Sequence, residues 1–257
     1  MTAIFHDMIY KEMEDYVDDI VVKSKTRTGH LRVLEQVFER YRKYKLRMNP
    51  MKYAFGVSTR KFLGFLVHHK GISVDPAKAT AIATMKRPTT VRELKSFLGR
   101  VSYIRRFVLR LVSVTTGLSK LLKKRTEFTW GTEQQEAFQR IQQIMNHLPT
   151  LQAPVQGRPL LLYLASNSQV IGALLAQEDD QRNEQPVYYV SRMLKDTETR
   201  YPRIEKACLV IIYASQRLKR YFSAHQILLV TKSHPIKAFL HQPLLTGRIA
   251  QWLVLLS

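Results

Sequence analysis

The chain is poor in cysteine and in acidic residues, and it has no long apolar run. Cys208 is the single cysteine among 257 residues, which excludes a disulfide within the chain and leaves the histidines without cysteine partners for a zinc site. No apolar stretch approaches the length of a membrane span, and residues 1–25 lack the basic start and apolar core of a secretory signal. We therefore expect an intracellular protein with no membrane partner, in a compartment that the sequence leaves unknown.

Basic residues outnumber the scarce acidic ones by two to one. The chain has 41 lysines and arginines against 20 aspartates and glutamates, a net charge of +21. Residues 1–130 carry 27 basic and 11 acidic residues, a net charge of +16, whereas residues 131–257 carry 14 and 9, a net charge of +5. Such a field attracts polyanions through counterion release. We therefore expect DNA or RNA to bind mainly to the first half, and a solvated basic face is the alternative.

Two adjacent aspartates stand inside a run of strand-forming residues, Tyr16-Val17-Asp18-Asp19-Ile20-Val21-Val22. The β-branched apolar residues around the pair predict a buried strand or a hairpin. Ionised carboxylates are costly there unless a cation compensates them, and Mg²⁺ prefers such hard oxygen ligands. Two such metals stabilise the attacking and leaving oxygens of a phosphoryl transfer. The other interpretation is an Asp-Asp turn exposed to solvent.

The periodicity of apolar residues predicts helices and strands in alternating groups. Residues 1–13 are expected to be the end of a helix. Further helices are expected over 28–44, 75–85, 91–102, 103–111, 114–124, 132–147, 201–221 and 235–240. Strands are expected over 15–24 as a hairpin, and over 53–57, 62–68, 160–165, 172–177, 187–191 and 226–231. Asp75 as a cap, with Pro76 at the first helical position, opens the helical segment. The fold class is therefore α+β.

An ordered series of motifs resembles the polymerase and RNase H regions of gypsy-class LTR retrotransposon Pol polyproteins, in particular a plant subset with a degenerate RNase H. The series is Tyr16-Val17-Asp18-Asp19, Met48-Asn49-Pro50-Met51-Lys52-Tyr53-Ala54-Phe55, Lys61-Phe62-Leu63-Gly64-Phe65-Leu66-Val67, Leu94-Lys95-Ser96-Phe97-Leu98-Gly99, Tyr103-Ile104-Arg105-Arg106-Phe107, Ile171-Gly172-Ala173 and Pro186-Val187-Tyr188-Tyr189-Val190-Ser191. The resemblance implies a partial reverse transcriptase palm of sheet and helices over 1–74. It further implies a helical thumb over 75–125, a connector over 126–157 and an RNase H-like α/β domain over 158–257.

The resemblance also implies roles for individual residues. Asp18 and Asp19 match the catalytic aspartates that hold Mg²⁺, with Mn²⁺ as an alternative. Lys52 matches a palm lysine near the departing pyrophosphate, and an ordinary exposed lysine is the other interpretation. Phe62, Leu63 and Gly64 match the segment that holds the primer end, or else form a buried strand with a glycine bulge. The implied partners are a DNA or RNA template-primer or hybrid, and other Pol-derived chains.

Several positions depart from the family pattern. Asp15 is an acid where an apolar strand residue is expected, which brings like charges together. The third palm aspartate of the family lies upstream of Met1, so we expect a piece truncated at both ends whose polymerase site is incomplete and binds metal weakly. In the RNase H pattern, Ala165 and Lys232 stand where the family has aspartates, and Glu205 matches the family glutamate. Glu205 is then a remnant of a degenerate nuclease site, or a solvated helix residue.

These observations lead to one expected function and two alternatives. The family activity is RNA-directed DNA synthesis with RNase H. We expect this piece to be inactive alone and to retain nucleic-acid binding, which leaves its status as an enzyme open. The alternatives are a module that only binds nucleic acid and a silent relic of a retroelement.

Overall fold

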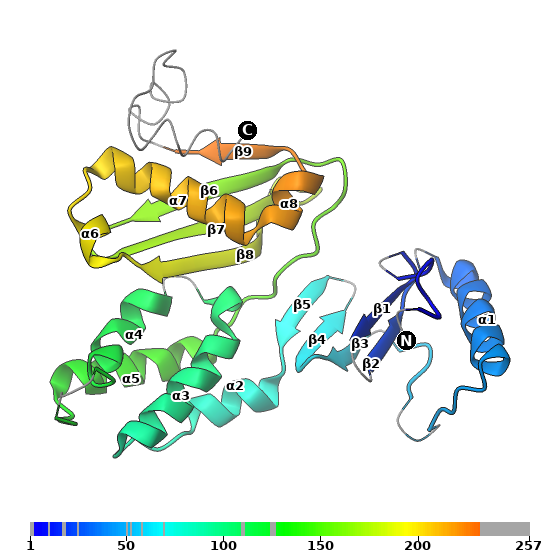
Figure 1. Ribbon diagram of the computed structural model, residues 1–257, viewed down its shortest axis with the longest axis horizontal. Helices are drawn as coiled ribbons and strands as arrows, with labels where there is room; N and C mark the ends of the chain where they lie inside the picture. The colour runs from blue at the N-terminus through cyan, green and yellow to red at the C-terminus, as the bar shows by residue number, and fades with distance from the viewer. Residues whose placement is uncertain are drawn as a thin grey trace, which may run out of the picture. The chain divides into compact units, whose positions relative to one another are not determined.

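The computed structural model describes residues 3–9, 11–16, 19–24, 26–49, 51, 53–57, 59–68, 70–108, 111–123 and 127–231 (Figure 1). The chain divides into two compact units, Met1–Val67 and His68–Ser257. Its helices and strands together confirm the α+β class. Within the described part, every helix is too short or too polar to cross a membrane.

The first unit is built around the predicted hairpin and one long helix. Strands β1 (Met13–Tyr16) and β2 (Asp19–Val22) pair antiparallel, and α1 (Arg27–Lys43) packs its Val37 and Tyr41 into a core with Phe5, Met8 and Met13. The Thr26 hydroxyl caps α1 by accepting a hydrogen bond from the Gly29 amide at 3.1 Å. The hairpin and the helix are both confirmed.

The segment before the hairpin differs from its prediction. Residues 3–9 form turns rather than the end of a helix, and the Met8 and Ile9 amides both donate to the Phe5 carbonyl. Arg40 on α1 holds this segment, because it donates to both carboxylate oxygens of Asp7 at 2.5 Å and to the Ile4 carbonyl at 2.8 Å. Burial of Phe5 against α1 favours the turn, since this contact lies outside the local sequence.

Three short strands follow, β3 (Thr59–Phe62), β4 (Phe65–His68) and β5 (Gly71–Val74), in sheet order β3-β4-β5. The strand predicted over 53–57 is wrong, because these residues have no strand partner. The strand predicted over 62–68 is interrupted by a turn at Leu63 and Gly64, and β5 was not predicted. Ile72 on β5 forms an antiparallel bridge with Leu151, through amide-carbonyl bonds of 2.8 and 2.9 Å.

A group of helices occupies the middle of the chain, and most of them begin where the sequence predicts. Asp75 caps α2 (Pro76–Ala83) and Thr90 caps α3 (Val91–Tyr103). In each cap, a side-chain oxygen accepts a hydrogen bond from a backbone amide. Helices α4 (Leu111–Lys120) and α5 (Thr132–Met145) follow. The helix predicted over 103–111 is wrong: a short 3₁₀ turn, η2 (Arg105–Phe107), replaces it, with the Phe107 amide bonded to the Ile104 carbonyl.

The last region is a four-stranded sheet covered by a helix on one face (Figure 1). Its strands are β6 (Leu160–Ser166), β7 (Val170–Glu178), β8 (Glu184–Met193) and β9 (Ile227–Val230), in the order β8-β7-β6-β9. Its helices are α6 (Asp196–Thr199), α7 (Arg203–Arg217) and α8 (Lys219–Ala224). The helix predicted over 201–221 therefore ends and restarts at Leu218. The helix predicted over 235–240 lies outside the described residues.

The centre of this sheet explains one glycine of the quoted motifs. A Cβ atom at Gly172 on β7 would lie 2.9 Å from the Val190 carbonyl oxygen and 3.3 Å from the Ser191 Cβ on β8. Strands β7 and β8 pair through Gly172 and Ser191, so a side chain at this position would force the two backbones apart. Gly172 thus serves strand pairing.

Candidate functional site

The Asp-Asp pair stands, in sequence, where the first strand of the hairpin gives way to the second. The register of the hairpin pairs Tyr16 with Asp19, and Val17 and Asp18 lie between them in sequence and outside the described residues. Asp19 is the first residue of β2, and its side chain is not among the described atoms. The structure thus places the Asp19 backbone at the start of β2, while Asp18 lies outside the described residues. Their roles as metal ligands remain a prediction.

Asp15 lies on the face of the hairpin that packs against α1. Asp15 pairs with Ile20, and side chains alternate along a strand, so Asp15 shares its face with Met13, Ile20 and Val22. These three residues contact the apolar core of the first unit. The Oδ1 atom of Asp15 is buried and has no hydrogen-bond partner among the described residues. The departure from the family pattern at this position is therefore costly because a carboxylate oxygen is desolvated.

We expect Asp15→Val to stabilise the hairpin by about 1 to 3 kcal/mol, because it removes an unpartnered buried oxygen and places a β-branched residue in a strand. Native-state hydrogen exchange of the β1 and β2 amides in the full chain measures this change. Glu14→Val is the matched control, because Glu14 lies on the opposite face and forms an exposed ion pair with Lys23. Slower exchange in Glu14→Val alone, or faster exchange in Asp15→Val, would contradict the expectation.

The segment Phe62-Leu63-Gly64 forms a tight turn between β3 and β4. Leu63 and Gly64 both have positive φ angles, +50° and +75°, as in the type I′ turns that connect two-residue hairpins. β3 is exposed along most of its length and Leu63 is 40% exposed, so the alternative of a buried strand with a glycine bulge is wrong. A leucine with positive φ is uncommon, and such strain concentrates at functional positions. The primer-holding role remains a prediction, and Lys52 lies outside the described residues.

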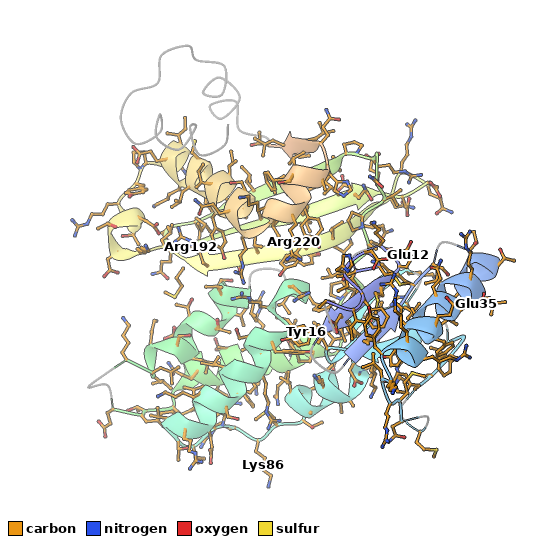
Figure 2. All side chains as sticks on the ribbon, turned by 45° about the vertical axis from the view of Figure 1, so that its right-hand side comes forward. Glu12, Tyr16, Glu35, Lys86, Arg192 and Arg220 are labelled. Carbon is orange, nitrogen blue, oxygen red and sulfur yellow. The ribbon has the colours of Figure 1, made fainter. Side chains whose placement is uncertain are left out.

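Residues 75–107 form a basic helical segment. They include eight lysines and arginines and two acidic residues, of which Asp75 is buried as a helix cap. Seven of the basic residues are exposed: Lys78, Lys86, Arg87, Arg92, Lys95, Arg100 and Arg105. Figure 2 shows Lys86 extending from the connection between α2 and α3. Positive charge is therefore concentrated at the surface of these helices, where a polyanion can reach it.

The RNase H-like positions occupy the sheet and the helix as the alignment implies. Ala165 lies near the end of β6, opposite Gly172 on β7, and Glu205 lies half-buried in the first turn of α7. Lys232 lies outside the described residues. Cys208 is buried one turn after Glu205; burial, assisted by the Glu205 charge, raises the pKa of its thiol to about 11. In the described part of the chain, no three His, Cys, Asp or Glu side chains are grouped to hold a metal.

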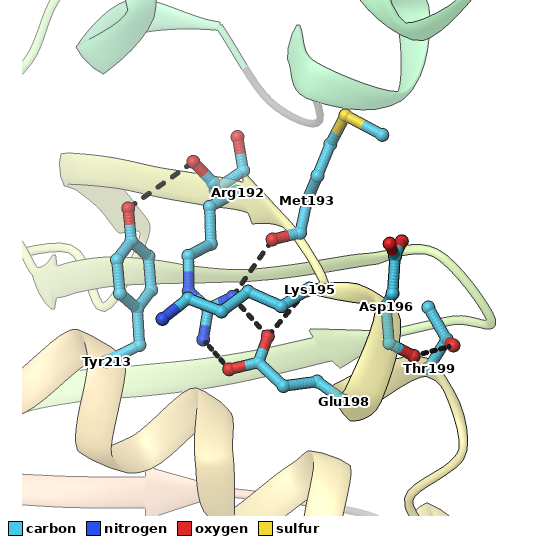
Figure 3. A network of polar contacts seen from close by, with 8 residues as sticks. Arg192, Met193, Lys195, Asp196, Glu198, Thr199 and Tyr213 are labelled. Carbon is cyan, nitrogen blue, oxygen red and sulfur yellow. Dashed lines mark hydrogen bonds and ion pairs between the residues drawn. The ribbon is translucent and has the colours of Figure 1, made fainter.

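Sequence reasoning missed a polar network at the end of β8 (Figure 3). Arg192 donates two hydrogen bonds to Glu198, at 2.6 and 3.0 Å, and a third to the Met193 carbonyl. The Lys195 amide also donates to Glu198, and the Arg192 guanidinium lies 5.2 Å from the centre of the Tyr213 ring. Burial alone would raise the pKa of Glu198, but the hydrogen bonds from Arg192 and Lys195 outweigh it, and the pKa is lowered. Arg192 and Glu198 are six positions apart, and no pattern in the sequence predicts that they pair.

Comparison with known families assigns two separate parts of the chain. Residues 1–67 match the model of reverse transcriptase (RNA-dependent DNA polymerase), and residues 130–229 match the RNase H-like domain found in reverse transcriptase. The chain thus combines a reverse transcriptase region with an RNase H-like region. The reverse transcriptase region coincides with the first compact unit, and the RNase H-like region contains α5 and the four-stranded sheet.

The chain is similar to parts of longer transposon polyproteins. The chain is 30% identical to a retrovirus-related Pol polyprotein from transposon 297 of Drosophila melanogaster and 32% identical to that from transposon opus, over 100% and 97% of its length. It is 28% identical to the Tf2-3 transposon polyprotein of Schizosaccharomyces pombe over 81% of its length. It spans 24%, 26% and 16% of these three polyproteins, respectively.

Solved structures show the same fold. The foamy viral protease-reverse transcriptase in complex with an RNA/DNA hybrid superposes with a TM-score of 0.79 at 21% identity, over 100% of this chain and 35% of that one. The same viral protein in complex with double-stranded DNA gives a TM-score of 0.81 at 21% identity, over 99% and 45%. The helical group and the sheet therefore follow the arrangement of a reverse transcriptase.

Proposed function

We propose that this chain is a nucleic-acid-binding part of a retrotransposon reverse transcriptase, and that it holds a template-primer duplex or RNA/DNA hybrid. The exposed basic helical segment 75–107 carries this proposal, because it concentrates positive charge on helices that follow the reverse transcriptase region in the sequence. The two foamy viral structures, which contain a hybrid and double-stranded DNA, support the same class of partner. Other Pol-derived chains are the second class of binding partner that we propose.

Asp18 and Asp19 are the proposed ligands for a divalent metal. Two consecutive carboxylates at the end of a hairpin offer the hard oxygen donors that Mg²⁺ and Mn²⁺ prefer, so the chemistry of the donor set fits the metal. When bound, the metal supplies charge stabilisation to the oxygens of a phosphoryl transfer. The residues of this chain contribute the negative charge of two adjacent carboxylates. Loss of Mn²⁺ binding in Asp18→Asn with Asp19→Asn, measured by electron paramagnetic resonance, tests this assignment.

We expect the affinity for an RNA/DNA hybrid to fall steeply with salt, because each phosphate contact releases a counterion. The triple substitution Arg92→Gln, Lys95→Gln and Arg100→Gln removes three exposed charges from α3. It should lower the slope of log affinity against log salt by about 1 for each contact that is lost. Fluorescence anisotropy with a labelled hybrid measures both the affinity and the slope.

The matched control removes the same charge from the RNase H-like region. Lys195→Gln, Arg200→Gln and Arg203→Gln are also exposed positions, and they lie outside the basic helical segment. We expect this triple variant to bind nearly as well as the unchanged chain. An equal loss in both variants would show that binding depends on total charge rather than on residues 75–107. A flat salt response in the unchanged chain would contradict the proposal itself.

The RNase H-like region is proposed to be degenerate, like that of a plant subset of gypsy-class elements. Nuclease chemistry of this kind needs several carboxylates around two metals, and the methyl group of Ala165 replaces one of them. Lys232 replaces another and adds a positive charge where a cation should bind. Glu205 is then the sole match to the family's acids among these three positions.

We expect the full chain to leave the RNA strand of a hybrid intact in Mg²⁺ or Mn²⁺, as judged by denaturing gel electrophoresis. Glu205→Gln is the control, and its background should equal that of the unchanged chain. Cleavage by the unchanged chain that disappears in Glu205→Gln would mean that the alignment at Ala165 is wrong. The apolar core of the region does not use these acids, so both proteins should remain folded.

A further inference from the structure

A cavity of about 230 Å³ lies between the helical group and the sheet of the RNase H-like region, inside the second compact unit. One wall comes from α3, η2 and α4, and the other comes from β8 and α7. Both η2 and α4 contact β8, and the Arg106 guanidinium lies 5.5 Å from the centre of the Tyr188 ring. Neither the Asp-Asp hairpin nor Ala165 and Glu205 line the cavity, so it is separate from the two sites that the sequence suggests.

Two arginines line this cavity from opposite walls. Arg105 comes from η2 and Arg217 from the last turn of α7, and both are exposed. Neither forms an ion pair or a side-chain hydrogen bond with any described residue, and no described acidic residue lines the cavity. By contrast, Arg192 is paired with Glu198 and Arg158 with Asp180. Two guanidinium groups that share a cavity repel one another, and a bound anion would offset this repulsion.

The remaining lining offers flat aromatic surface and hydrogen-bond acceptors. Tyr189 and Tyr213 are half-buried and line the cavity. The Tyr213 hydroxyl donates to the Ser191 carbonyl at 3.4 Å, which orients its ring beside β8 (Figure 3). The Thr115 and Ser119 hydroxyls donate to carbonyls within α4, so their lone pairs are left to accept. Aromatic rings stack with bases, and hydroxyl acceptors suit the N–H groups of a base.

We propose that this cavity binds a single nucleoside 5′-phosphate, with Arg105 and Arg217 on the phosphate and the base against the tyrosine wall. A volume of about 230 Å³ is below the roughly 300 Å³ at which ligand pockets usually begin, which excludes any ligand larger than one nucleotide from the cavity. The nucleotide is either free or the 5′-phosphorylated end of a strand. Arg105 also belongs to the basic helical segment, whereas Arg217 does not, and the triple variant of α3 leaves both arginines of the cavity in place.

Isothermal titration calorimetry of the full chain with dAMP, deoxyadenosine and inorganic phosphate tests the proposal at about 150 mM NaCl, where weak surface attraction is screened. We expect one dAMP per chain, and binding of deoxyadenosine and of phosphate that is weaker by about tenfold or more. Arg105→Gln and Arg217→Gln should each weaken dAMP binding by about tenfold. The controls Arg200→Gln, after α6, and Arg203→Gln on α7 remove exposed arginines outside the cavity, and should stay within about twofold.

Three results would overturn the proposal. These are no saturable dAMP binding, an equal loss in the control variants, and phosphate binding as tight as that of dAMP. A trinucleotide separates the two sources of the ligand. If its 5′-phosphorylated form binds at least as tightly as dAMP, the site takes strand ends, and if it binds about tenfold more weakly, the site takes the free nucleotide. Hybrid binding by Arg105→Gln with Arg217→Gln, measured separately, keeps this outcome distinct from that of the proposed function.

Discussion

Gly71→Ala should destabilise the second unit by about 3 to 5 kcal/mol, because two costs combine at this position. Gly71 has a φ of +135°, which residues with a side chain rarely adopt. A Cβ atom there would also lie 2.0 Å from the Leu151 carbonyl oxygen and 2.9 Å from the Gln152 Cα. Both obstacles are backbone atoms and cannot rotate away. Accommodating the methyl group would break the bridge between Ile72 and Leu151.

Hydrogen exchange at the Ile72 and Leu151 amides measures this loss directly, since each amide donates across the bridge. Substitutions at two other glycines of the second unit separate the cost of backbone strain from the cost of the steric clash. Gly157→Ala combines a φ of +84° with open space, so it reports backbone strain alone, expected at about 1 to 2 kcal/mol. Gly99 lies in α3, where an added Cβ atom would meet nothing within 4 Å beyond the helix's own backbone. Gly99→Ala should therefore stabilise the unit by up to about 1 kcal/mol. If the Ile72 and Leu151 amides were equally protected from exchange in Gly71→Ala and Gly157→Ala, the steric clash at Gly71 would be refuted.

Glu198→Ala should cost about 3 to 5 kcal/mol, because it leaves the Arg192 guanidinium largely buried without its carboxylate. Glu198 is 8% exposed, and its two oxygens accept from Arg192 and from the Lys195 amide. Chemical denaturation followed by circular dichroism measures the loss in the full chain. Replacing both partners by Arg192→Met with Glu198→Leu should recover most of it, since no uncompensated charge remains.

The exposed pair of Arg158 and Asp180 gives the matched control. The Asp180 side chain is 86% exposed, so Asp180→Ala should change the stability by no more than about 0.5 kcal/mol. The stabilisation by Glu198 should also depend on pH. Its pKa is lowered in the folded chain, so the contribution is fully present above the usual value of 4.5 and is lost as the pH falls through the lower folded value. A cost for Glu198→Gln that grows on acidification would contradict this assignment.

Local signals in the sequence determined the elements that local chemistry stabilises. Asp75 followed by Pro76, and Thr90 with Glu93, specify helix starts through caps that use neighbouring atoms, and α2 and α3 begin there. The β-branched residues around Asp18 and Asp19 specify the hairpin for the same reason. The ordered motifs likewise indicated a reverse transcriptase region and an RNase H-like region, which the family matches confirm.

The tertiary structure decided the features that depend on distant parts of the chain. Alternating apolar residues over 53–57 form no strand, because a strand needs a partner that the local pattern does not provide. Gly71 must be a glycine because the backbone of Leu151 approaches it from far along the chain. The buried contact of Glu198 with Arg192, and the cavity that joins Arg105 to Arg217, likewise arise when separate elements pack together. Contacts of this kind depend on packing geometry, which hydrophobic periodicity does not encode.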